Sequence, residues 1–240
     1  MTNKPSIDPA NEGDLLGALR HIIGKEIQNL DGMLPAKIVS FDRATNRATV
    51  QPLVMVLTTS DKTLSRATIA SVPVYQIGGG GFILNFNLNP GDLGWIKASD
   101  RDISLFLQGY KEAGPNTLRK HSFSDAVFYP DVMTGYSIAS EDAANAVLQN
   151  LDGTVRISMW PTKVKVTAPL VEVVAPSVEI DAATTHMTGA LNVDGAITSL
   201  STIDGTTITG STDVIAGTIS GKTHVHGGVT PGTGTSGVPQ

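Results

Sequence analysis

Four consecutive seven-residue units decide the fold of this chain: KVKVTAP (163–169), LVEVVAP (170–176), SVEIDAA (177–183) and TTHMTGA (184–190). Within each unit, apolar residues alternate with other residues, as the two faces of a β-strand require. Because seven is odd, successive units would fall on opposite faces of one straight strand, so the chain must bend once in each unit. Looser copies with single Val, Leu or Ile residues continue as far as Ile219.

The units align three columns of apolar or small residues: Val164, Val171 and Val178; Val166, Val173, Ile180 and Met187; Ala168, Ala175, Ala182 and Gly189. A stripe this narrow forms no core in one chain, so such units must stack on a partner. Winding three copies around one axis buries the stripe and leaves few free strand edges. The pattern predicts an intertwined, triple-stranded β-helix. The alternative is a disordered Ser/Thr/Gly linker, which the low charge and the regular columns disfavour.

The two ends of the chain differ in composition. All twelve aromatic residues lie at or before Trp160, and large aromatic side chains are the usual filling of a globular core. Residues 138–240 carry four basic and nine acidic groups, which accounts for the whole net charge of −5. These differences predict a boundary near Ser137–Ala143. The predicted domains are a leading segment with a helix (1–32), a barrel (33–137), a β-helix spike (138–222) and an apex (223–240).

The N-terminal part combines one helical pattern with several short strand patterns. Apolar residues recur at helical spacing from Leu15 to Leu30, which predicts an amphipathic helix that ends near Asp31-Gly32. Turn-rich segments then separate short apolar runs, and a series of short strands favours a small barrel. The predicted strands are 36–41, 48–56, 73–76, 82–86, 93–97 and 104–108.

His224 and His226 are the best candidates for a binding site. Residues i and i+2 of a strand face the same side, so both imidazoles would point one way while Val225 points the other. Two imidazoles are too few for a usual metal site, but a parallel trimer would bring six to one axis. Six nitrogens suit octahedral iron(II) or nickel better than zinc, which prefers four ligands. The alternatives are a remnant affinity tag and two solvated histidines.

The remaining glycine and histidine motifs do not indicate a ligand site. Gly78–Gly81 resembles a phosphate-binding loop only in its glycines, because no Gly-Lys-Ser/Thr and no helical pattern follow, so a hairpin turn is expected. His21, His121 and His186 each stand alone in the sequence, and a structural or solvated role is expected for all three. Motifs such as GxSxG and HExxH are absent.

The other polar features argue against catalysis, nucleic-acid binding and membrane insertion. Asp100, Asp102 and Asp125 are interpreted as turn carboxylates, so no acid–base pair is predicted. The chain has no cysteine, which excludes disulfides and Cys-based zinc sites. Its acidic net charge provides no attraction for nucleic acid. No signal peptide and no membrane span are recognised, which predicts synthesis in the cytoplasm.

Three parts of the chain resemble the central spike proteins of contractile phage tails, the membrane-piercing needles at the baseplate tip. They are LPAKIVSFDRATNRATVQPLV (34–54), GGGGFILNFNLNPGDLGWI (78–96) with HSFSDAVFYPDV (121–132), and THVHGGVTPGTGTSGVPQ (223–240). The likeness covers most of residues 12–135 and the last eighteen, and between them it is one of repeat style. Ala36 departs from the family pattern, in which glycine is expected.

The resemblance implies an all-β homotrimer that is a component of the virion tail tip, made in the host cytoplasm. Its N-terminal OB-fold barrel would dock on a baseplate hub protein, and its triple-stranded β-helix would taper to an apex. There His224 and His226 of three chains would bind one iron ion, with nickel or zinc as alternatives, and residues 227–240 would fold back over the apex. The implied role is mechanical piercing of the bacterial outer membrane, without enzymatic activity.

Two other functions fit parts of the sequence. A trimeric tail fibre or adhesin that binds a cell-surface glycan would share the β-helix, but it should end in an aromatic receptor domain, and no aromatic residue follows Trp160. A metal-dependent cell-wall hydrolase would need an open coordination position and a nearby carboxylate base. Six imidazoles leave no such position, and Asp213 is the nearest acid before the histidine pair.

Overall fold

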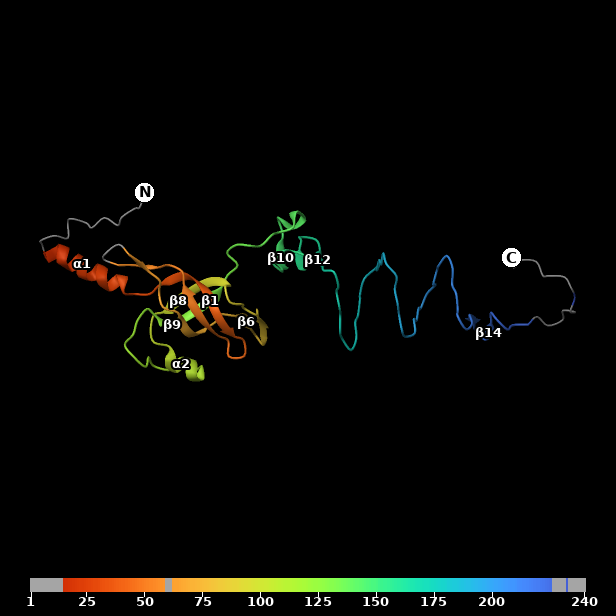
Figure 1. Cartoon of the computed structure of the whole chain (residues 1–240). Helices are drawn as coiled ribbons and strands as arrows, with labels where there is room; N and C mark the ends of the chain where they lie inside the picture. The colour runs from red at the N-terminus through yellow and green to blue at the C-terminus, as the bar shows by residue number, and fades with distance from the viewer. Residues whose placement is uncertain (1–14, 59–61, 226–231, 233–240) are drawn as a thin grey trace. The chain divides into compact units, whose positions relative to one another are not determined.

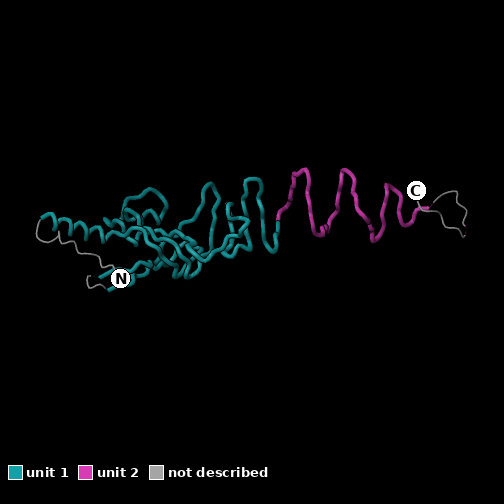
Figure 2. Tube along the Cα trace, turned by 90° about the horizontal axis from the view of Figure 1, so that it is seen from above, with its two compact units in different colours: residues 1–173 teal, residues 174–240 magenta. Residues whose placement is uncertain are grey.

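The computed structural model describes residues 15–58, 62–225 and 232, and it is mostly β, as predicted (Figure 1). The internal contacts of the chain divide it into two units, Met1–Val173 and Val174–Gln240 (Figure 2). Both helices and the two larger sheets belong to the first unit. The described part of the second unit contains a single short hairpin.

A nearly closed, barrel-like sheet forms most of the first unit. Its strands are β1 (Met33–Asp42), β2 (Arg47–Pro52), β5 (Ile69–Pro73), β8 (Leu93–Ser99) and β9 (Ser122–Pro130). They pair antiparallel in the order β5-β2-β1-β8-β9. The two edges meet at a parallel bridge between Val74 and Phe128, where the Tyr75 N–H donates to the Phe128 carbonyl at 2.8 Å. This bridge brings the sheet close to a complete barrel.

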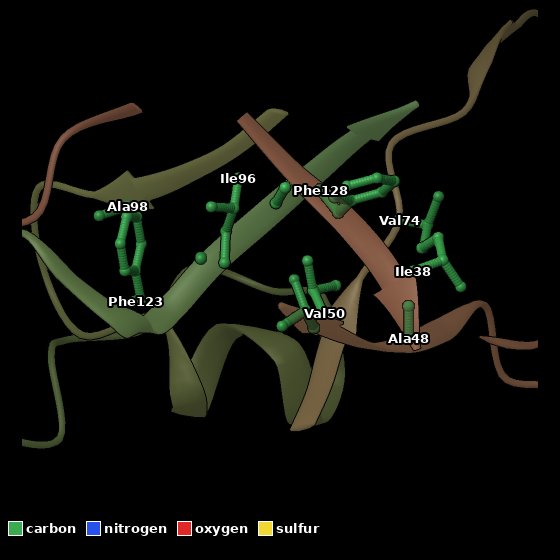
Figure 3. Packing of buried hydrophobic residues seen from close by; sticks show 11 residues of the cluster. Ile38, Ala48, Val50, Val74, Ile96, Ala98, Phe123 and Phe128 are labelled. Carbon is green, nitrogen blue, oxygen red and sulfur yellow. The ribbon is translucent and has the colours of Figure 1, made fainter. Parts of the chain in front are cut away.

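The hydrophobic core lies inside this sheet (Figure 3). Strand β2 alternates buried and half-buried residues, as a strand with one face on a core must. The ring of Phe128 is fully buried, and it lies over Gly94 of β8, where any added methyl group would overlap the ring. Among the described residues, every buried hydrophobic side chain lies between Ala36 and Phe128. Within the described residues, the buried hydrophobic core therefore belongs to the barrel.

Helix α1 (Leu15–Gln28) confirms the predicted N-terminal helix, and its large apolar side chains remain exposed. Two small hairpins project from the barrel connections: β3 (Val56–Leu57) with β4 (Thr63–Leu64), and β6 (Ile77–Gly79) with β7 (Phe82–Leu84). The second hairpin contains the glycine-rich run. Gly80 and Gly81 adopt positive φ angles of 59° and 86° at its turn, a conformation that glycine favours.

The strand predicted at 104–108 is wrong, because this segment forms the short helix α2 (Ser104–Gly109). The Asp102 carboxylate accepts a hydrogen bond from the Ser104 N–H at 2.9 Å, which satisfies a backbone donor at the helix start. Tyr110 ends the helix in the left-handed conformation and donates its N–H to the Phe106 carbonyl. In place of the strand predicted at 73–76, the structure has β5, which ends at Pro73. Strand β9 is not among the predicted strands.

A second, three-stranded antiparallel sheet follows the barrel in sequence. It contains β10 (Ala146–Gln149), β11 (Arg156–Met159) and β12 (Val164–Thr167), and the 3-10 turn η2 (Ser140–Asp142) precedes it. Residues 168–214 form no regular helix or strand within one chain, and their hydrophobic side chains are exposed or, for Ala168, half-buried. The triple-stranded β-helix therefore stays a prediction. The described chain ends with the hairpin β13 (Ile215–Ala216) and β14 (Ile219–Ser220).

Candidate functional site

The segment that leads to the histidine pair is folded by a network around Asp213. One oxygen of its carboxylate accepts the N–H groups of Val214 at 2.8 Å and Lys222 at 3.0 Å. The Gly221 N–H also donates to the Val214 carbonyl at 2.8 Å. Hydrogen bonding from Ser220, followed by that from backbone N–H groups, lowers the pKa of Asp213 below its ordinary value. These bonds fix the end of the β13–β14 hairpin just before the histidines.

His224 is held by Ser220, four residues earlier. The Ser220 carbonyl accepts the backbone N–H of His224 at 3.1 Å, and it lies 3.0 Å from the Nδ1 atom of the ring. A carbonyl can only accept, so this geometry assigns the proton to Nδ1 and the lone pair to Nε2. A second hydrogen bond of this kind is how proteins orient a metal-binding histidine. His226, the other predicted ligand, lies outside the described residues.

The described residues of one chain do not gather further metal ligands around His224. Among residues 15–58, 62–225 and 232, no three His, Cys, Asp or Glu side chains of one chain gather into a possible metal site. An imidazole with its lone pair on Nε2 is a good ligand for iron, nickel or zinc. The metal site predicted at His224 and His226 therefore stays a prediction.

The isolated histidines do not join this segment. His121 has a positive φ of 45°, and its Nδ1 lies 3.8 Å from an Asp100 oxygen on the surface of the barrel unit. His21 is exposed on α1, and His186 is exposed in the repeat. The structure thus brings none of the three into a shared cluster within the described chain.

The interpretation of Asp102 and Asp125 as turn carboxylates is incomplete, because both are buried. The Arg119 side chain donates to Asp125 at 3.1 Å and to Asp102 at 3.1 Å, and the Thr117 hydroxyl donates to Asp102 at 2.6 Å. Hydrogen bonds from Ser104 and Thr117 hold the pKa of Asp102 well below its usual range. These buried, hydrogen-bonded carboxylates tie the segment that follows β8 to strand β9.

A third buried carboxylate organises the small sheet. Asp142 is fully buried, and its oxygens accept from the Arg156 Nε at 2.9 Å, the Ser158 hydroxyl at 2.8 Å and the Trp160 indole at 3.1 Å. Burial alone would raise the pKa of Asp142, but the hydrogen bonds from Ser158 and Arg156 outweigh it and leave the pKa lowered. Glu141 extends this network, which we call the Asp142 cluster, through ion pairs with Arg156 and Lys165.

Acid should destabilise the first unit because it protonates Asp102, Glu141 and Asp142, whose pKa values are lowered in the folded chain. A folded-state pKa below the unfolded value of about 3.9 means that the stabilisation is complete above that value and is lost as the pH falls through the folded pKa. We expect the thermal midpoint, followed by circular dichroism, to be constant down to about pH 5 and to fall below about pH 4. An Asp102→Asn variant should be less stable at pH 7 and lose less stability in acid. A midpoint that rises on acidification would contradict this assignment.

A comparison with known protein families finds a match for the barrel. Residues 34–131 match the family model described as "Phage protein Gp138 N-terminal domain". No curated protein matches the chain. The matched residues begin in β1 and end just after β9, so they coincide with the barrel-like sheet. The match supports a phage structural protein and a component of the virion. Across residues 15–58, 62–225 and 232, no helix has the length and apolar character needed to span a membrane.

Proposed function

We propose that this chain is the central spike of a contractile phage tail or a related particle, a homotrimer that docks on the baseplate hub and pierces the bacterial outer membrane. It acts as a mechanical part without catalytic turnover. The match of residues 34–131 to a phage-protein domain supports the phage assignment. The finer role, that of a trimeric needle, rests on the repeat and on the apex sequence.

The barrel supports the first half of this proposal. Counted in chain order, its five strands pair as third-second-first-fourth-fifth, and the third and fifth approach each other in parallel at Val74 and Phe128. A five-stranded, partly open barrel of this kind agrees with the OB-fold that the resemblance implies. We propose that this domain is the part that docks on the hub, because it contains the hydrophobic core found among the described residues.

The observation that carries the proposal is the absence of a core in the described part of the repeat. Val171, Val173, Val178 and Ile180 are each exposed by 59–68% in a single chain. A stable protein does not leave such regular apolar columns in water when a partner can cover them. Three copies around one axis cover all the columns at once, and chains that intertwine separate slowly, which suits a device loaded by force.

Location of the chain in the particle tests the proposed role directly. Gold-labelled antibodies against the barrel should bind the tail tip of purified virions, after mild opening of the baseplate if necessary. Particles assembled without the chain should adsorb to cells and fail to permeabilise the outer membrane. Label on the capsid or on the fibres would contradict the spike assignment, as would release of glycan fragments by the purified protein.

Removal of the His224 imidazole should remove the metal. We expect purified trimers of the parent chain to contain one metal ion, iron in the first place, per three chains. A His224→Ala trimer should contain none, because two imidazoles from each chain are needed to fill six positions. His186→Ala is the matched control, since His186 is an exposed histidine of the same unit. Elemental analysis combined with native mass spectrometry gives the ratio, and a metal-containing His224→Ala trimer would contradict the ligand assignment.

A further inference from the structure

The small sheet β10–β12 has its apolar side on the outside. Its register places two rows of cross-strand neighbours on one face: Leu148, Ile157 and Val166, and beside them Ala146, Met159 and Val164. All six side chains are exposed, and the five larger ones range from 41% for Ile157 to 67% for Val164. We call these six residues the outer face. None of them carries a charge or a hydrogen-bonding side chain.

The inner face of the same sheet is polar and is covered by its own chain. Arg156 and Ser158 belong to this face, and both bind the buried Asp142, which precedes the sheet in sequence. Lys165 is the cross-strand partner of Ser158 and pairs with Glu141. Every member of this cluster finds its hydrogen-bond and ion-pair partners within one chain. The Asp142 cluster thus covers the polar side of the sheet within one chain, whereas the apolar side stays exposed.

The outer face continues directly into the repeat. A shallow groove of about 340 Å³ lies along it, and its apolar lining includes Leu148, Ile157 and Val166 together with Ala168, Leu170 and Val171. Val164 and Val166 are also the first members of the two Val/Ile columns of the repeat. As far as Val171, the outer face and the start of the columns therefore line one apolar groove, and a partner that covers this groove also covers the sheet.

A repetitive stalk has a register problem that this sheet can solve. The units that begin at Lys163, Leu170 and Ser177 are so similar that three chains displaced by one unit would still align Val and Ile columns. Such a slip costs little within the repeat itself. The sheet, by contrast, occurs once in each chain, and the Asp142 cluster and its turns fix its strands. Pairing of three outer faces would leave only one alignment.

We propose that sheet β10–β12 is a register collar, whose outer face packs against the outer faces of two further copies of this chain and aligns the three repeats that follow. The inference rests on the trimer of the proposed function. The occupant is another copy, because the face is uncharged and continuous with the columns that the copies share. The Asp142 cluster keeps each collar folded before the chains meet.

Substitution of the outer face tests the collar in the full chain. In an Ile157→Asp variant, a carboxylate would be buried at the three-fold contact without a partner, and we expect the yield of trimers after refolding from denaturant to fall about tenfold or more. Leu118→Asp is the matched control, because Leu118 is 94% exposed in a barrel loop. Equal trimer yields from the two variants would overturn the proposal.

A milder substitution at the same position provides a second test in case Ile157→Asp unfolds the sheet. The chain has no cysteine, so a single Ile157→Cys substitution gives one reactive thiol per chain. Oxidation should link two chains of each trimer through Cys side chains on adjoining outer faces, whereas Leu118→Cys should stay uncrosslinked at the same dilution. Crosslinking no greater than that of the control would overturn the collar.

The alignment of the three chains is measured as distances between nitroxide labels attached to a Val174→Cys variant. Val174 suits the label because it is 88% exposed and lies outside the columns. Trimers of this chain should give one narrow distance distribution, and residual trimers that also carry Ile157→Asp should add longer distances from slipped chains. Identical distributions would overturn the alignment role. A monomeric parent chain would instead overturn the proposed trimer, so the two failures are distinguishable.

Discussion

A Val173→Asp chain is expected to stay monomeric under conditions in which the parent chain is a trimer. Val173 belongs to the second Val/Ile column and is 68% exposed in a single chain, so only other chains can bury it. In a three-chain β-helix, the substitution would place three carboxylates around one axis without partners. Each buried, unpaired charge costs several kcal/mol, and the three repel one another, so the assembled state should be lost.

The neighbouring valine provides the control. Val174 lies outside the columns and is 88% exposed, so Val174→Asp should leave the trimer intact. Both variants add the same charge within one residue, and light scattering of the eluted peak reports the mass of each. Loss of the trimer in both variants, or in neither, would show that the columns do not face a shared axis.

Replacement of Phe128 by alanine should destabilise the barrel by about 3–5 kcal/mol, the range for deletion of a fully buried aromatic ring. The Phe128 side chain has no exposed surface, and its backbone forms the bridge to Val74 that nearly closes the sheet. The loss is large compared with the 5–15 kcal/mol that stabilises a typical domain. Chemical denaturation followed by fluorescence from Trp95 in β8 would measure it.

Phe82 is the matched control for Phe128. It is 83% exposed on hairpin β6–β7, so Phe82→Ala should change the free energy of unfolding by no more than about 0.5 kcal/mol. The comparison separates the effect of the core from the general effect of removing a phenyl ring. Similar losses from the two variants would contradict the position of the barrel core.

Local patterns in the sequence predicted part of the fold. The helical spacing of Leu19, Ile23 and Ile27 identified α1, and the glycine-rich run identified the β6–β7 turn. The prediction for residues 104–108 is wrong because their short run of consecutive apolar residues fits a buried strand as well as a helix. The hydrogen bond from the Ser104 N–H to Asp102 starts a helix there. Strand β9 was missed because it buries a carboxylate, Asp125, at a position where alternation requires an apolar residue.

The candidate site was also predicted only in part from the sequence. Spacing alone identified His224 and His226, but the support of His224 by the Ser220 carbonyl depends on the hairpin that Asp213 closes. The collar could not be predicted from the sequence either. Alternation in the unit 163–169 indicated one apolar face for β12 alone, and only the buried Asp142 reveals that the polar face of the sheet is the one turned inward. Such long-range bonds leave no periodic trace in a sequence.

The mass of the native parent particle tests the central claim most directly, because every proposal about the repeat, the collar and the apex requires three chains. Native mass spectrometry of the untagged protein should give a particle of about three times the 25.1 kDa chain mass, stable on dilution. A particle of 25.1 kDa at all concentrations would contradict the account, since the exposed Val and Ile columns would then have no partner.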